Sequence, residues 1–161
     1  MLRWKTRSRG ADETYVVIEG ELTEMESLVG LEVDTARVVL NLARVRYINS
    51  EGSRRLLGLF RDLAEHGEVT AELCSPVVVE LFNMVPLMAS YVQVISVIIP
   101  TECEECTFES DVRMRLPGNG EVPTISCPPC PQCGGVMEPS VVLDRYLAFV
   151  GDPGPGQNPK A

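Results

Sequence analysis

Long apolar runs and signal-like segments are missing from this sequence. The longest apolar stretch, Tyr91 to Pro100, is interrupted by Gln93 and Ser96. It falls short of the roughly 20 residues that a membrane-spanning helix needs. The opening "MLRWKTRSRG" is basic but lacks the apolar centre of a signal peptide. We therefore expect a cytoplasmic protein with no direct membrane insertion.

Histidine and positive charge are also scarce. The only histidine, His66, is expected at the end of a helix, and no G-x-S-x-G motif accompanies it, so a serine–histidine active site is not indicated. The chain has 14 Lys and Arg against 23 Asp and Glu, a net charge of -9. This balance argues against nonspecific nucleic-acid binding, which depends on neutralising phosphates. The composition favours a protein that is not an enzyme and binds no nucleic acid.

What the sequence does contain is a regular alternation of strand and helix patterns in its first hundred residues. Hydrophobic residues make up 45% of the chain, enough for a packed core. The strongest helix pattern lies between Gly52 and Gly67, and a second begins at Ser75-Pro76 and ends at Pro86. The expected strands lie at 15–18, 37–42, 47–48, 69–73 and 92–99, with a short helix within 24–31. This order predicts an α/β fold with a sheet covered by helices.

The character of the chain changes at Pro100. Residues 100–150 are poor in apolar side chains and contain five of the six cysteines. We predict a frayed basic arm over 1–10, an α/β domain over 11–99, a small β module over 100–150 and a disordered tail over 151–161.

Two C-x-x-C pairs dominate this second module, Cys103 with Cys106 and Cys130 with Cys133. Each pair can wrap one side of a tetrahedral ion, and four thiolates suit zinc and close its coordination shell. The spacing therefore predicts a structural zinc site. The alternatives are an iron–sulfur cluster and a redox role of "CEEC". The segment "CPPCPQC" contains two overlapping pairs, which leaves the role of Cys127 open. We favour Cys130 and Cys133 because Gly134 follows them and lets backbone amides turn toward a thiolate, and Cys127 is then a spare thiol beside the site.

A hairpin is expected between the two pairs. Val112, Met114 and Leu116 alternate, "PGNG" follows, and Val122 and Ile125 suggest a returning strand. Two knuckles joined by a hairpin resemble a zinc ribbon over about residues 101–139. The first knuckle is acidic, which disfavours DNA or RNA and favours contact with a protein. Its acidic residues are Glu102, Glu104, Glu105, Glu109 and Asp111.

Three segments of the first domain resemble a STAS domain, the module of anti-sigma-factor antagonists and of sulphate-transporter tails. "VIEGELT" is similar to the family's first strand, and "VVLNLARVRYINSEG" to its central strand, which ends in Ile-Asp-Ser-Ser-Gly. "SPVVVELFNMVPL" is similar to its third-helix region. The resemblance covers about residues 11–99. It implies an α/β fold and a role in binding other signalling proteins.

The resemblance also implies a modification site. In phosphorylated family members a kinase-like anti-sigma factor modifies the serine that corresponds to Ser50. A phosphate there would meet the free N–H groups of a helix start, with Arg54 and Arg55 one turn on. Asn49 and Glu51 stand where the family has Asp and Ser or Thr. The residues themselves leave another reading open, in which Asn49 or Ser50 only caps the helix that continues through Gly52.

We therefore expect a non-enzymatic adaptor, with possible partners among kinase-like anti-sigma factors and other signalling components. The candidate partner-binding residues surround the start of this helix, and the only cofactor expected is zinc. The alternatives are an accessory subunit of a membrane transport complex and a small zinc- or thiol-dependent enzyme.

Overall fold

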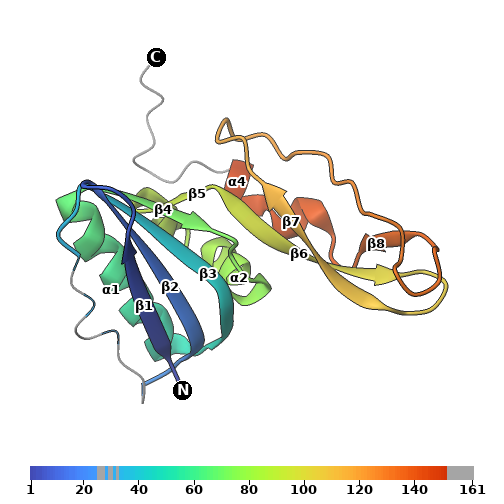
Figure 1. The fold of residues 1–161 in the computed structure, drawn as a ribbon, viewed down its shortest axis with the longest axis horizontal. Coiled ribbons are helices and arrows are strands. Elements are labelled where there is room, and N and C mark those ends of the chain that lie inside the picture. Colours follow the sequence, from blue (N-terminus) through green and yellow to red (C-terminus); the bar gives the residue numbers. More distant parts are fainter. Residues whose placement is uncertain (25–27, 29–30, 32, 152–161) are drawn as a thin grey trace.

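The computed structural model describes residues 1–24, 28, 31 and 33–151. A five-stranded sheet, in the order β1-β2-β3-β4-β5, forms its larger part (Figure 1). β2, β3, β4 and β5 are parallel neighbours and only β1 runs antiparallel, so the predicted α/β class is confirmed. The strand bounds are Arg3–Ser8 for β1, Glu13–Leu22 for β2, Arg37–Ile48 for β3, Glu68–Glu72 for β4 and Gln93–Val94 for β5.

Strand β1 occupies the segment predicted to be a frayed arm, and that prediction is wrong. Its six residues pair with β2 along their whole length, from Arg3 opposite Glu19 to Ser8 opposite Thr14. The basic residues of β1 lie at every second position and are exposed, which masked the strand pattern in the sequence. Charged side chains of this kind are common on the outer strand of a sheet because they discourage edge-to-edge aggregation.

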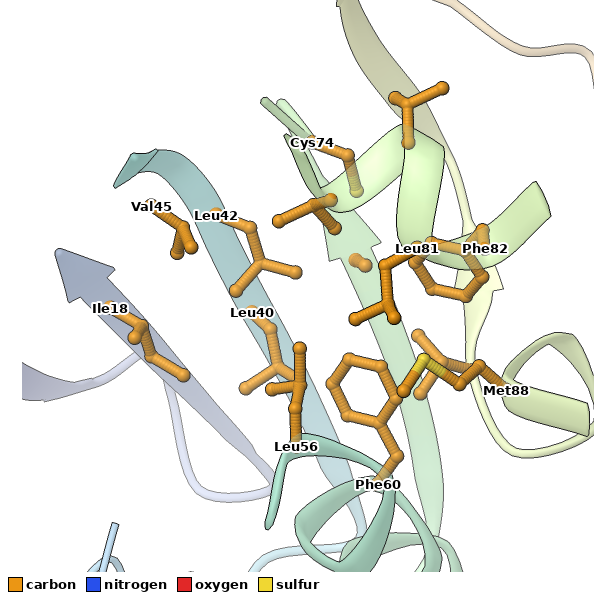
Figure 2. Packing of buried hydrophobic residues seen from close by; sticks show 14 of the residues in the cluster. Ile18, Leu40, Leu42, Val45, Leu56, Phe60, Cys74, Leu81, Phe82 and Met88 are labelled. Atoms are coloured by element: carbon orange, nitrogen blue, oxygen red, sulfur yellow. The ribbon is translucent and has the colours of Figure 1, made fainter. Parts of the chain in front are cut away.

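Helices α1, Ser50–His66, and α2, Pro76–Met84, pack together over one face of the sheet (Figures 1 and 2). Phe60 of α1 stacks on Phe82 of α2, with ring centroids 6.0 Å apart. Leu40 and Leu42 of β3 lie beneath them. Such a layer of fully buried side chains is the main source of stability in a domain of this size.

The opposite face of the sheet is only half-buried. Arg37 is exposed, and Val39 and Asn41 are half-buried, although they alternate with buried neighbours on β3. The apolar run at 37–42 therefore includes positions on the less buried face, so its pattern does not indicate a strand that is buried on both faces. Asn41, Tyr15 and Glu72, on three adjacent strands, form a hydrogen-bonded group on this open face.

A second sheet extends away from the first. It contains β6, Ser96–Cys103, between β7, Glu109–Arg115, and β8, Met137–Pro139, and all its pairs are antiparallel. The single strand expected over 92–99 is thus divided between β5 and β6. The hairpin expected across "PGNG" is also wrong, because β7 pairs with β6 and residues 116–136 form no strand.

The chain returns to the first core after β8. The one-turn helices α3, Leu143–Tyr146, and α4, Ala148–Gly151, bring Leu147 to a fully buried position and Phe149 against Phe82, with centroids 5.5 Å apart. Asn83 binds this segment by accepting from the Phe149 amide at 2.9 Å. A 3₁₀ turn, η1, Pro86–Ser90, follows α2. The core of the first sheet therefore includes side chains from beyond Pro100.

Two expected features fall where the structure gives little or no description. Most of the segment 24–31, where a short helix was expected, and all of the predicted tail except Gly151 lie outside the described residues. Among the residues that are described, no helix combines the length and the apolar character needed to cross a membrane.

Candidate functional site

The far end of the second sheet brings four cysteines together. Cys103 is the last residue of β6, and Cys106 lies in the turn between β6 and β7. Cys130 and Cys133 lie in the segment before β8. The Sγ atoms of Cys103 and Cys133 are 3.5 Å apart, those of Cys106 and Cys130 are 3.6 Å apart, and all four lie within 4.8 Å of one another. One metal ion could therefore contact all four sulfurs.

The backbone around Cys103 forms a tight knuckle. The Cys103 amide donates to the carbonyl of Phe108 at 2.8 Å, and the Thr107 amide donates to the carbonyl of Cys103 at 3.0 Å. Thr107 has a φ of 58°, in the left-handed region that β-branched residues rarely adopt. The knuckle thus holds a residue in a costly conformation, as expected where the local structure must direct a ligand side chain.

The segment around Cys130 has the same geometry. Its amide donates to the carbonyl of Gly135 at 2.9 Å, and the Gly134 amide donates to the carbonyl of Cys130 at 2.8 Å. Gly134 has a φ of 77°, so the left-handed residue again directly follows the second cysteine of the pair. The Gly135 amide lies 3.4 Å from the Cys133 sulfur. The two knuckles therefore position their sulfurs with the same pattern of backbone hydrogen bonds and a left-handed residue.

The pKa values of Cys130 and Cys133 are shifted in opposite directions. Burial acts to raise the pKa of Cys130, but hydrogen bonds from the backbone amides of Cys133 and Gln132 and from neighbouring thiols lower that pKa to about 7. The Gly135 amide acts to lower the pKa of Cys133, yet the hydrogen bonds it makes with the neighbouring thiols raise that pKa to about 12. Four adjacent thiolates would repel one another, and a cation bound between them would offset that repulsion and favour loss of the thiol protons.

The remaining cysteines stand apart from this group. Cys127 packs beside it, but its sulfur is not among the clustered atoms of the described residues. Burial, together with the nearby carboxylate of Glu138, raises the pKa of Cys127. Cys74 is fully buried in the first core, where burial raises its thiol pKa. Neither thiol is placed to complete the cluster.

Three acidic residues lie side by side on one face of the second sheet. Glu102 of β6 lies directly opposite Glu109 of β7 and Glu138 of β8, and all three are exposed. Like charges directly opposite each other destabilise a sheet, so this row is not explained by stability. Glu138 was not singled out in the sequence, because its strand is only three residues long.

The start of α1 lies at the end of the central strand β3. Asn49 is the N-cap, and its side-chain oxygen accepts from the Gly52 amide at 2.8 Å. Its amide group donates to the carboxylate of Glu24. Ser50 is therefore the first helical residue rather than the cap, and it is exposed. Of the two residues that the sequence left open as the cap, the structure selects Asn49.

The neighbours of Ser50 are arranged around Glu51. This carboxylate lies 3.5 Å from the Arg54 guanidinium and 3.2 Å from that of Arg55, while the Arg54 side chain remains 81% exposed. Only glycine fits at position 52, because a Cβ there would lie 2.0 Å from the carbonyl oxygen of Leu22. Tyr47, two residues before the cap, has an exposed ring, and the sequence reading, which assigned residues 47–48 to a short strand, did not identify that exposure.

Neither a scan against protein-family models nor a search of curated proteins finds a match for this chain.

Proposed function

We propose that this chain is a non-enzymatic protein-interaction adaptor, in which a STAS-like α/β domain carries a structural zinc ribbon. The observation that carries the proposal is the exposed helix start at Ser50, at the end of the central strand of the α/β sheet, in a chain whose metal-binding group offers only cysteine sulfurs. Both features suit the recognition of a partner better than turnover of a substrate.

Zinc is the metal that fits the cysteine group best. A tetrahedral ion with Zn–S distances of about 2.3 Å holds its sulfurs about 3.8 Å apart, and the closest sulfur pairs here are 3.5 and 3.6 Å apart. Four thiolates leave no open position for a substrate or a water molecule. The ion would therefore hold the two knuckles together and present the acidic face, a structural role.

The partner surface of this proposal surrounds Ser50. Tyr47, before the helix start, is 52% exposed, and the side chain of Arg54, in the first turn, is 81% exposed. Tyrosine and arginine are over-represented among residues that dominate binding energy at protein interfaces. A partner such as a kinase-like anti-sigma factor or another cytoplasmic signalling protein would cover this helix start.

Phosphorylation of Ser50 is the proposed switch. The helix N-terminus favours negative charge, and Arg54 could turn from Glu51 to a phosphate one turn away. Glu51 opposes this change, because its carboxylate already lies at the helix start. The modification would therefore act mainly by placing two negative charges in the partner surface.

An affinity capture from the native cell, read by mass spectrometry, tests the proposal. Wild type and Ser50→Ala should retain the same partner, because alanine removes only a hydroxyl. Ser50→Asp should lose it, because an unpaired carboxylate is costly to bury in an interface. Ser8→Asp, which adds the same charge at the opposite end of the sheet, is the matched control. Equal recovery of the partner by all four proteins would contradict the proposed surface.

A further inference from the structure

An arginine-lined groove lies on the opposite side of the sheet from the helices, beside strand β1. Its volume is about 550 Å³, within the range of small-molecule sites. The groove is lined by Met1, Arg3, Glu19, Gly20, Ala43, Arg44 and Arg46. Its basic side chains are the three arginines.

The sheet register explains how two of these arginines come together. Arg3 of β1 and Arg44 of β3 flank Glu19 of β2, each directly opposite it. Glu19 lies 3.3 Å from the Arg44 guanidinium, but the Arg44 side chain is still 76% exposed. The side chains that line the groove, three arginines and one glutamate among them, carry two net positive charges, although the whole chain carries -9.

The backbone at the groove departs from regular sheet geometry. The pairing of β2 with β3 shifts between Val17 and Glu19 and again between Gly20 and Glu21, and β3 gains one extra residue at each shift. Such bulges redirect side chains and are common beside binding sites. The second shift lies at Arg46, which is exposed.

Gly20 fixes the floor of the groove. Its φ is 112°, and a Cβ there would lie 2.2 Å from the carbonyl oxygen of Met1. Only glycine lets the two backbones approach so closely without strain. The groove is thus formed by a position at which a side chain has no room.

We propose that this groove binds a small organic phosphate monoester, a site separate from the partner surface at Ser50. A phosphate monoester carries nearly two negative charges at pH 7 and above, matching the groove's net charge. Planar guanidinium groups bind phosphate oxygens in pairs. Ala43 and the Met1 side chain supply an apolar wall for the organic part. The net charge of -9 disfavours the binding of long polyanions. Salt screens a small ligand from charges that lie farther away than the Debye length, which is about 10 Å at 0.1 M salt.

Titration of the full chain with phenyl phosphate, followed by NMR and calorimetry at pH 8, tests the site. Phenyl sulfate keeps the ring but carries one charge, and phenol carries none. Phenyl phosphate should bind most tightly and should shift the amide signals of Arg3, Gly20 and Arg44. Equal affinity for the sulfate, or no saturable binding of phenyl phosphate at millimolar concentration, would overturn the proposal.

Variants locate the binding. Arg46→Gln and Arg3→Gln should each weaken phenyl phosphate at least about tenfold, the usual loss for one charge-assisted hydrogen bond. Arg61→Gln removes an exposed arginine on α1 and should leave the affinity unchanged. Equal losses in all three variants would show a nonspecific charge effect. Tighter binding of a phosphoserine peptide than of phenyl phosphate would assign the groove to a protein ligand and overturn the small-molecule assignment.

Discussion

The two sheets of this molecule are stabilised by different means. The five-stranded sheet packs against α1 and α2 through a continuous layer of buried leucine, isoleucine, valine and phenylalanine side chains. Among the described residues, the apolar cluster at the cysteine end of the second sheet has three buried members, Cys103, Cys130 and Met137. Half-buried Phe108 is the largest side chain packed against them. So small an apolar cluster cannot offset the conformational entropy of ordering both knuckles.

The difference in buried apolar surface indicates what stabilises each region. The first sheet is stabilised by buried apolar surface, which comes from its own strands, from α1 and α2, and from side chains beyond Pro100. The knuckles direct four sulfurs to one point, where we propose a metal ion that stabilises them. Strand β6 belongs to both regions. Val97 and Ile99 are part of the first core, whereas Cys103 is part of the four-cysteine cluster.

The largest expected effect comes from a single ligand of the metal group. Cys103→Ser should abolish metal binding and unfold the knuckles, because four-cysteine zinc sites contribute about 10 to 16 kcal/mol to folding. The first sheet should remain folded. Metal analysis of the purified protein and two-dimensional NMR measure the two regions separately.

Cys127→Ser is the matched control for that substitution. Its sulfur lies beside the group but outside it, so metal content should equal that of wild type, near one ion per chain. Loss of metal from this variant, or retention of metal in Cys103→Ser, would show that the ligand set is misassigned.

A substitution in the first core should have a smaller and more global effect. Phe60→Ala should lower the free energy of unfolding by about 3 to 5 kcal/mol, because the ring is fully buried and stacks on Phe82. Leu57→Ala, one turn earlier and only half-buried, should cost clearly less. Urea denaturation followed by circular dichroism compares the two variants. A larger loss for Leu57→Ala would mean that the helix faces the sheet differently.

The smallest effect concerns the start of α1. Asn49→Ala should cost about 1 kcal/mol, because it removes the hydrogen bond to the Gly52 amide. Ser50→Ala should change stability by less than about 0.5 kcal/mol, since Ser50 is exposed and is not the cap. Thermal unfolding of both variants measures this difference. The reverse order of the two costs would assign the cap to Ser50.

The sequence predicted the features that depend on local pattern. The α1 periodicity, the proline at the start of α2 and the two C-x-x-C pairs each appear in the structure where they were expected. Gly134 was expected to allow a turn after Cys133, and its φ of 77° agrees. Periodicity, capping and ligand spacing act over a few residues, so they can be read without knowing the fold.

Features that depend on distant partners were missed. Ser75 was expected to cap α2, but its hydroxyl donates to the buried carbonyl of Val45 at 2.7 Å. Gly67 follows the last residue of α1, as expected, but nothing in the sequence indicated the close approach of Ala36, whose carbonyl oxygen would lie 2.1 Å from a Cβ at Gly67. Thr107 gave no sign of its left-handed conformation, since threonine is a poor residue for it.

The predicted pairing partner of β7 was wrong for the same reason, because it also depends on a distant segment. Residues 112–116 alternate as a strand, but alternation does not identify the neighbouring strand. The knuckle at Cys103 makes the tight turn that pairs β7 with β6. That turn could not be recognised from glycine or proline, because neither occurs between Cys103 and Phe108.

Hydrogen exchange measured by mass spectrometry, with and without a zinc chelator, tests most directly the claim that a metal stabilises one region and apolar burial the other. With chelator, protection should fall in residues 103–108 and 130–139. It should persist in β2, β3 and α1, and at the Val97 end of β6. Unchanged protection of both knuckles after complete removal of metal, or simultaneous loss across both sheets, would contradict this account.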